Sequence, residues 1–206
     1  AAMFAMFFFL TLYVQNILGY SPVKTGFAFL PVAITIGIVA GIASVLISKI
    51  GYKALMVAGP LLVAGGLAWL GYLPVQGEYF AHVLPPLVVV AAGMGLSFVS
   101  VTIAATNGVP AKDSGLASGL LNTTQQIGGA LGLAILSAVS ASATRGYFTD
   151  LATPPTPADQ AAALVDGFHA AFFTGAGLAV FAALVALILI RQEKGERITP
   201  NMAARA

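Results

Sequence analysis

Uncharged polar side chains lie inside a long apolar stretch of this chain, between residues 113 and 139. The stretch contains Ser118, Asn122, Gln125 and Gln126, and no charged residue follows Asp113 within it. It is long enough to cross a bilayer, which takes about 20 residues. Because lipid offers amides no hydrogen-bond partner, these side chains must face a neighbouring helix, a water-filled cavity or a ligand. The chemistry they could supply is hydrogen bonding to a solute or to another helix.

Helical geometry places these polar side chains on one face of the stretch. At about 100° per residue, they share an arc of roughly 140° with several glycines. The other side carries Leu116, Leu120, Ile127, Leu131 and Ile135. Two interpretations stay open: a helix–helix interface held by amide bonds of about 0.6 to 2 kcal/mol each, or the wall of a solute path.

Other apolar segments carry weaker polar features. Gln15 and Asn16 end the first segment, and Ser100 and Asn107 lie in the fourth. Serine and threonine hydroxyls in such helices usually bond to their own backbone, which favours a local role for them. We take as candidate residues of a substrate cavity Gln15, Asn16, Ser100, Asn107, Asn122, Gln125 and Gln126.

Catalytic and metal chemistry are not expected. No Asp, Glu, Lys, Arg or His lies in the middle of an apolar segment, and the chain has no cysteine. The sequence around Ser118, Gly-Leu-Ala-Ser-Gly, lacks the spacing of a nucleophile elbow. His82 and His169 lie near segment ends, where solvated interface residues are the favoured interpretation over a proton relay. We therefore expect neither an enzyme nor a metal site, and the net charge of +2 gives no argument for nucleic acid.

Composition places these residues in a membrane. The chain is 59% hydrophobic and 8% charged, against about 25% charged in soluble domains. Six spans are predicted, with Ser21 and Pro22 starting the second and a long, exposed, Pro-rich loop over 145–166 before the sixth. We expect a transmembrane domain over 1–191, a cytoplasmic tail over 192–206, and spans at 1–17, 22–48, 53–73, 81–108, 114–144 and 163–190.

Basic residues predict the orientation. Seven of them fall on one side of the six spans, and only Lys24 and Arg145 fall on the other. By the positive-inside rule the first side is cytoplasmic, so both chain ends face the cytoplasm of a multi-pass cell-membrane protein. The seven are Lys49, Lys53, Lys112, Arg191, Lys194, Arg197 and Arg205.

Small residues at a spacing of four predict close helix packing. The expected packing positions are Gly37, Gly41, Gly115, Gly119, Gly128 and Gly132. Gly93 and Gly95 are also interpreted as positions of close helix packing. Spans three and six lack such polar faces and are expected to be outer, lipid-facing helices. The order of polar, glycine-rich and outer helices occurs twice, which is typical of the 3+3 inverted repeat of half a transporter.

Three segments carry a resemblance to a known family. They are residues 12–31, with LYVQ, GYSP and GFAFLP; residues 115–132, with SGLLNTTQQ; and residues 167–172, GFHAAF. The chain resembles the C-terminal six-span half of a major facilitator superfamily transporter, in the 14-span drug/proton antiporter branch. The turn containing Lys49, Gly51 and Lys53 resembles a degenerate copy of that superfamily's gating loop, without its acidic residue.

The resemblance implies a function and partners. It implies export of small hydrophobic or cationic solutes by alternating access, driven by a proton gradient and without a cofactor. It also implies a missing N-terminal half, which the second and fifth helices would contact, while the first and fourth would line the cavity. The chain is accordingly expected to be a fragment of a larger transporter.

Two other classes stay open as alternatives. An uncharged polar cavity also suits a facilitator-type carrier of a sugar or another metabolite. A membrane scaffold that transports nothing is the other alternative, and it predicts that Asn122 and Gln125 can be replaced by leucine without loss of function.

Overall fold

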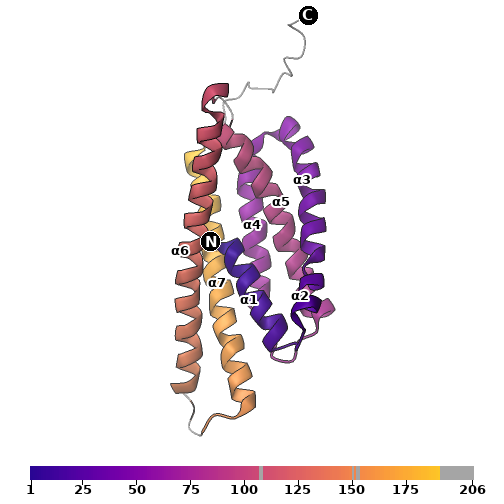
Figure 1. Ribbon diagram of the computed structural model, residues 1–206, viewed down its shortest axis with the longest axis vertical. Helices are drawn as coiled ribbons and strands as arrows, with labels where there is room; N and C mark the ends of the chain where they lie inside the picture. Colours follow the sequence, from indigo (N-terminus) through magenta and orange to yellow (C-terminus); the bar gives the residue numbers. More distant parts are fainter. Residues whose placement is uncertain (107–108, 150, 152–153, 191–206) are drawn as a thin grey trace, which may run out of the picture.

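The computed structural model describes residues 1–106, 109–149, 151 and 154–190. Within these ranges the chain is all-helical and contains no strand, as the sequence predicts. The helices form one elongated bundle (Figure 1). They are α1 (Ala2–Asn16), α2 (Pro22–Ala28), α3 (Leu30–Ile50), α4 (Tyr52–Leu70), η1 (Tyr79–Val83), α5 (Leu84–Thr106), η2 (Ala111–Asp113), α6 (Ser114–Thr149) and α7 (Pro157–Leu189).

Five helical stretches are long and apolar enough to cross a membrane: Pro22–Ile50, Tyr52–Leu70, Tyr79–Thr106, Ser114–Thr149 and Pro157–Leu189. They correspond to predicted spans two to six. The first predicted span is the shorter apolar helix α1, with 15 residues. At 1.5 Å per residue α1 is about 22 Å long, less than the hydrocarbon thickness of about 30 Å. Five of the six predicted spans are thus confirmed by length.

The second span is a broken helix. Ser21 caps its start, since its hydroxyl accepts a hydrogen bond from the Lys24 amide at 3.3 Å. Pro31 has no amide hydrogen to continue the helical ladder, so α2 stops and α3 starts anew. Phe29 lies at the junction and donates its amide to the Gly26 carbonyl at 3.2 Å. The predicted cap at Ser21 is confirmed, and the break is an addition to the prediction.

The predicted loop over 145–166 is wrong for most of its length. Helix α6 continues to Thr149, and α7 already begins at Pro157. Thr156 and Asp159 form a capping box: the Asp159 amide donates to the Thr156 hydroxyl at 3.2 Å, and the Asp159 carboxylate accepts the Thr156 amide at 2.9 Å. Hydropathy falls where lipid ends, but a capped segment rich in alanine keeps its helix in water as well.

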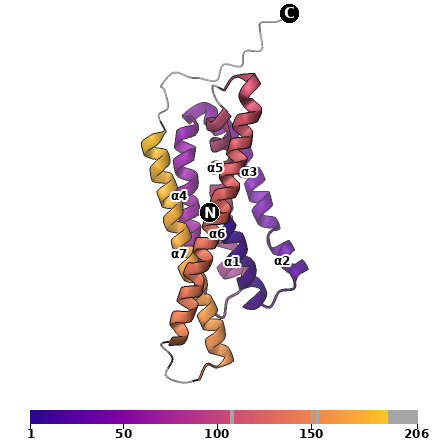
Figure 2. The same cartoon turned by 60° about the vertical axis from the view of Figure 1, so that its left-hand side comes forward.

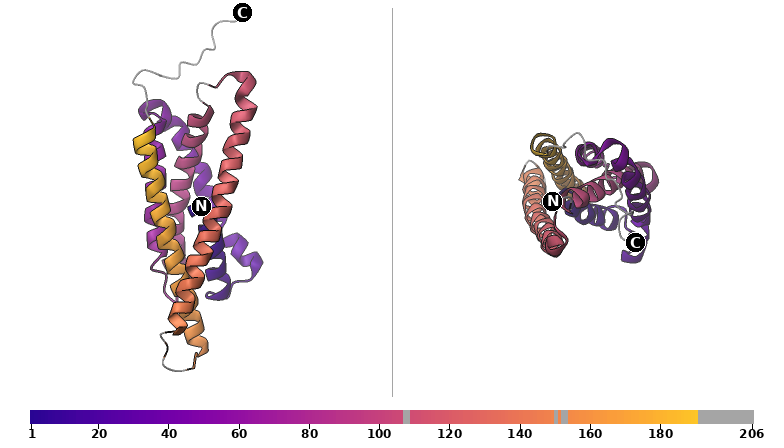
Figure 3. Two further views of the ribbon diagram at one scale, coloured as in Figure 1. Left: turned by 90° about the vertical axis from the view of Figure 1, so that its left-hand side faces the viewer. Right: turned by 90° about the horizontal axis from the view of Figure 1, so that it is seen from above.

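Helices α4 and α5 form the packed centre of the bundle. Helix α4 lies against α5 and α7, α3 lies against α5, and α6 lies against α7 (Figure 2). In its apolar stretch 44% of the residues of α4 are buried, compared with 17% for α2–α3 and 22% for α6. Leu61, Leu62 and Trp69 on α4 are nonetheless 39–52% exposed, so one side of this helix is open, and the prediction that spans three and six are outer, lipid-facing helices stays a prediction. The exposed helices are those with the polar and glycine-rich faces, α3 and α6, at opposite sides of the bundle (Figure 3).

Charged residues divide between the two ends of the bundle. Lys49, Lys53 and Lys112 lie at the end formed by the α3–α4 turn and the start of α6, which we call the basic end (Figure 1). Lys24 and Arg145 lie toward the opposite end, where α1 stops and α6 turns into α7. This arrangement agrees with the predicted division of the described basic residues between two sides of a membrane.

Candidate functional site: a cavity beside α6

A cavity of about 640 Å³ lies between α1, α4, α5, α6 and α7. Its polar lining includes Gln125 and Gln126 from α6, together with Thr124 and Ser97. Its apolar walls come from the first turn of α1 and from Met94, Phe98 and Leu178. Such a volume falls within the range of about 300–1,000 Å³ that small-molecule sites occupy, and a few polar groups in an apolar wall are typical of them. We call it the α6 cavity.

The hydroxyl groups around this cavity bond to their own helices. Ser97 donates to the Gly93 carbonyl at 2.8 Å, and Thr124 donates to the Leu121 carbonyl at 2.9 Å. Ser100 is fully buried and donates to the Leu96 carbonyl at 2.7 Å. These local bonds are the ones that serine and threonine favour in apolar helices. The amides of Gln125 and Gln126 are therefore the polar groups suited to meet a solute here.

The rest of the predicted polar face of α6 is exposed in the described structure. Ser118 and Asn122 are exposed, and so are Leu116 (76%) and Leu120 (64%) on the apolar side. The first half of α6 diverges from the other helices toward the basic end (Figure 3). None of the described residues covers either side of this segment, so the partner of the polar face stays a prediction.

Other candidate residues lie apart from the α6 cavity. Gln15 and Asn16 are in the last turn of α1, at the opposite end, with Asn16 exposed. Asn107 lies outside the described residues. The structure therefore brings Gln125 and Gln126 together at one cavity, whereas Gln15, Asn16, Ser100 and Asn122 are not among its lining residues.

The predicted packing glycines differ in their surroundings. A methyl group added at Gly37, Gly41, Gly115, Gly119 or Gly128 would lie more than 4 Å from every described atom beyond its own stretch of helix backbone. Gly132 lies directly against Ala1, and the neighbouring Gly129 lies against the ring of Phe4. Any close partner of the first five positions must come from outside the described chain, and their packing role stays a prediction.

Other glycines close the bundle, and the interpretation of Gly93 and Gly95 as positions of close helix packing is confirmed. A methyl group at Gly93 would lie 2.6 Å from the Gly59 carbonyl oxygen, and one at Gly95 would lie 3.1 Å from the Ile36 carbonyl oxygen. Gly59 and Gly66 both lie against α5. Gly59 and Gly66 are seven residues apart, which places them on the same face of α4 two turns from each other. This spacing is the pattern in the sequence that indicates their packing role.

The turn between α3 and α4 has a simple structural basis. Gly51 adopts a φ of 81°, a conformation that glycine reaches without strain, and its amide donates to the Ile47 carbonyl at 2.8 Å. Lys49 and Lys53 flank it. The glycine is thus required by the turn itself, and the gating role of Lys49, Gly51 and Lys53 stays a prediction.

At the opposite end, three side chains fix the connection between α4 and α5. The Tyr13 hydroxyl donates to the Pro74 carbonyl at 2.7 Å, and Nε2 of His169 lies 2.7 Å from the Leu73 carbonyl oxygen. The Tyr79 hydroxyl donates to the Ala28 carbonyl at 2.5 Å. Side chains from α1, α7 and η1 thus fix segment 71–79, which no pattern in the sequence indicated.

Comparison with known proteins identifies the family. The sequence model of the Major Facilitator Superfamily matches residues 1–133, well over half of the chain. The chain belongs to the major facilitator superfamily. Within the described residues, no group of three or more His, Asp or Glu side chains could hold a metal ion.

Relatives of this superfamily chain include named resistance and export proteins. A puromycin resistance protein of Streptomyces alboniger is 36% identical over 191 residues, 91% of this chain and 38% of that protein. A cephamycin export protein of Amycolatopsis lactamdurans is 38% identical over 155 residues, 74% of this chain and 32% of that protein. A tetracenomycin C resistance and export protein of Streptomyces glaucescens is 30% identical over 227 residues, 92% of this chain and 42% of that protein. The chain thus spans less than half the length of these transporters, and proteins of this class are not enzymes.

Proposed function

We propose that this chain is the C-terminal half of a proton-driven multidrug exporter that works by alternating access. The observation that carries the proposal is the similarity to three resistance and export proteins over 74–92% of this chain. The α6 cavity suits the same activity, because its apolar walls fit hydrophobic solutes and its two glutamines offer hydrogen bonds. The solutes would be small hydrophobic or cationic compounds.

The exposed faces of α3 and α6 suit a partner half of the same transporter. Gly37, Gly41, Gly115 and Gly119 have free space above them, which lets another helix approach closely. An N-terminal half packed there would cover the exposed faces of α3 and α6. It would also form the opposite wall of the solute path beside Gln125. This arrangement would also give Asn122 a polar environment, which lipid denies it.

Energy for export would come from the proton gradient, and no cofactor is required. No carboxylate lies in the middle of any span of this chain, so the proton-binding acid belongs to the partner half in this scheme. The protein would lie in the cell membrane with its basic end toward the cytoplasm, and both chain ends there too.

Export can be tested with the full-length gene in a drug-sensitive bacterium. We expect cells that express it to accumulate less ethidium, and a protonophore to abolish the difference. Gln125→Leu should raise accumulation at an unchanged membrane level of the protein, whereas Leu131→Ala, on the apolar side of α6, should not. Uptake of a labelled sugar without any change in ethidium would support a metabolite carrier instead. Ethidium levels that respond to neither the gene nor Gln125→Leu would refute the proposal.

A further inference from the structure

An open groove runs along the outside of α4 at the basic end of the bundle. It has a volume of about 480 Å³, and five residues of α4 between Lys53 and Leu61 line it, together with Ile50 at the end of α3 and Leu187 near the end of α7. Figure 2 shows the end of α7, in yellow, beside the first half of α4. We call it the α4–α7 groove. It is separate from the α6 cavity, because the two share no lining residue.

The floor of the α4–α7 groove is apolar. Ala54 and Ala58 are exposed and lie one turn apart on the same face of α4, so their small side chains leave a channel between larger ones. Leu61 and Leu187 border this channel and are 48% and 51% exposed. Spans three and six, which are α4 and α7, are also the ones expected to face lipid. An exposed apolar channel on such helices fits a hydrocarbon chain.

The groove is about as long as one leaflet of a bilayer is thick. At 1.5 Å per residue, the α4 backbone rises by about 12 Å between Lys53 and Leu61. The hydrocarbon core of a bilayer is about 30 Å thick, which leaves about 15 Å for each leaflet. A groove that starts at the basic end therefore extends from the headgroup region through most of one leaflet.

A lysine lies where the groove opens at the basic end. Lys53 is the charged residue of the lining and is partly buried, whereas Lys49, one turn earlier, is exposed. A lysine in this position lays its apolar stem along the groove and keeps its ammonium group among the headgroups. Among the described residues of the basic end, Asp113 is the single carboxylate beside Lys49, Lys53 and Lys112. The local charge therefore favours an anion.

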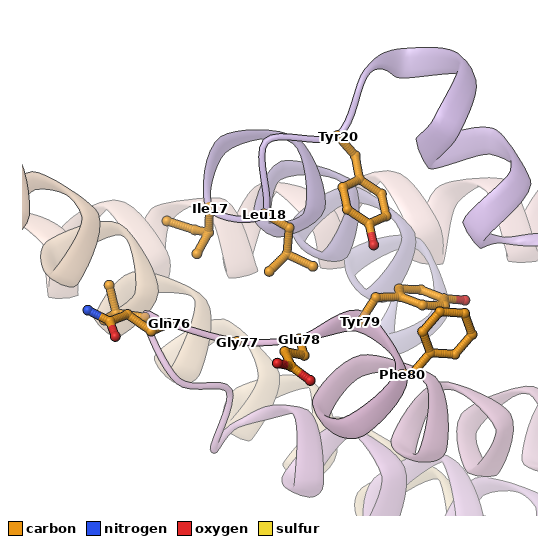
Figure 4. Close-up of a pocket in the computed structure, with 9 residues that line it drawn as sticks. Ile17, Leu18, Tyr20, Gln76, Gly77, Glu78, Tyr79 and Phe80 are labelled. Atoms are coloured by element: carbon orange, nitrogen blue, oxygen red, sulfur yellow. The ribbon is translucent and has the colours of Figure 1, made fainter.

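The pocket at the opposite end of the bundle carries the reverse charge. It lies between the α1–α2 connection and segment 75–80, and its charged lining residue is Glu78 (Figure 4). A carboxylate repels an anionic headgroup, whereas an ammonium group attracts one. Of these two pockets, the α4–α7 groove is the one that suits an anionic lipid.

We propose that the α4–α7 groove binds an anionic phospholipid, with one acyl chain over Ala54 and Ala58 and the headgroup phosphate at the Lys53 ammonium. A lysine near the membrane surface strengthens the binding of an anionic lipid by about five-fold. The apolar floor adds contact with the acyl chain, which a free phosphate ion lacks. Binding here requires no transport and is independent of the proposed export function.

The test is native mass spectrometry of the full-length protein in detergent with two lipids that share their acyl chains. Dioleoyl phosphatidylglycerol carries a net negative charge, and dioleoyl phosphatidylcholine carries none. We expect the first bound phosphatidylglycerol to bind about five-fold more tightly than phosphatidylcholine. Lys53→Gln should remove this preference, and Lys53→Arg should keep it. Lys49→Gln, at an exposed lysine of the same end outside the groove lining, should leave the preference unchanged.

Ala58→Phe tests the place of the acyl chain. The ring would fill the floor of the groove, so both lipids should bind several-fold more weakly while the melting temperature of the lipid-free protein stays the same.

Equal effects of Lys49→Gln and Lys53→Gln would show a diffuse attraction to the basic end and would overturn the proposal. Glycerol phosphate that competes as well as the whole lipid would overturn it too. An affinity that responds to neither Lys53→Gln nor Ala58→Phe would point to another occupant of the groove, such as the other half of the protein or a second copy, and would also overturn it. Loss of drug export with the lipid preference intact would refute only the proposed function.

Discussion

Replacing Gly93 by alanine tests the packing of the bundle centre. The new methyl group would lie 2.6 Å from the Gly59 carbonyl oxygen and 2.7 Å from the Val63 amide nitrogen, well inside the 3.4 Å at which ordinary contact begins. Both neighbours are backbone atoms and cannot rotate away, so α4 and α5 must separate. Overpacking of this kind costs about 1–3 kcal/mol.

Gly41→Ala is the matched control for this substitution. Among the residues that the structure describes, none lies within 4 Å of a methyl group at Gly41, apart from its own stretch of helix backbone. Both substitutions gain about 1 kcal/mol of helix propensity, so the difference between the two variants isolates the steric cost. We expect Gly93→Ala to be less stable than Gly41→Ala by about 1–3 kcal/mol.

The free energy of unfolding can be measured by titration with dodecyl sulfate in mixed micelles. Trp69 is the single tryptophan of the chain and lies in α4, so its fluorescence reports on the helix that must move. Equal stability of the two variants would refute the close crossing of α4 and α5. A Gly41→Ala variant that is strongly destabilised would show that α3 has a close partner within the chain.

His169→Ala should speed protease cleavage within segment 71–78, because it removes the contact to the Leu73 carbonyl; His169→Gln can still donate and should slow cleavage again. Thr156→Ala should speed amide hydrogen exchange in the first turn of α7 by several-fold, because the capping bond is lost, and Thr156→Ser should restore protection. Ser100→Ala should change the free energy of unfolding by less than about 1 kcal/mol and leave drug affinity unchanged, since the hydroxyl bonds only to its own helix. A clear loss of drug affinity in that variant would place Ser100 in the solute path.

The sequence was informative wherever a local rule decides the structure. Apolar runs located the spans, and Ser21 with Pro22 marked the start of α2. The polar face of α6 followed from helical periodicity, and two of its members, Gln125 and Gln126, line the α6 cavity. These features depend on residues within a few turns of each other, so one sequence is enough to find them.

Features that depend on distant contacts were not predicted. The crossing of Gly59 with Gly93 joins two helices, and spacing within one helix does not name its partner. The bond between His169 and Leu73 joins residues 96 positions apart. The helical ends of α6 and α7 within the predicted loop at 145–166 were not predicted. Hydropathy indicates where the lipid-embedded part of a helix ends, and it does not indicate where the helix itself ends.

The central proposal is that the polar face of α6 borders a water-filled solute path in the full-length protein. The chain has no cysteine, so single cysteines placed in α6 give unique labelling sites. In membrane vesicles of a cysteine-free full-length exporter, Asn122→Cys and Gln125→Cys should react with a maleimide and be protected by a bound drug. Leu116→Cys and Leu120→Cys, on the apolar side, should react slowly because thiols in lipid do not ionise. Unreactive Asn122→Cys and Gln125→Cys variants, or equal reaction on both sides, would contradict the account.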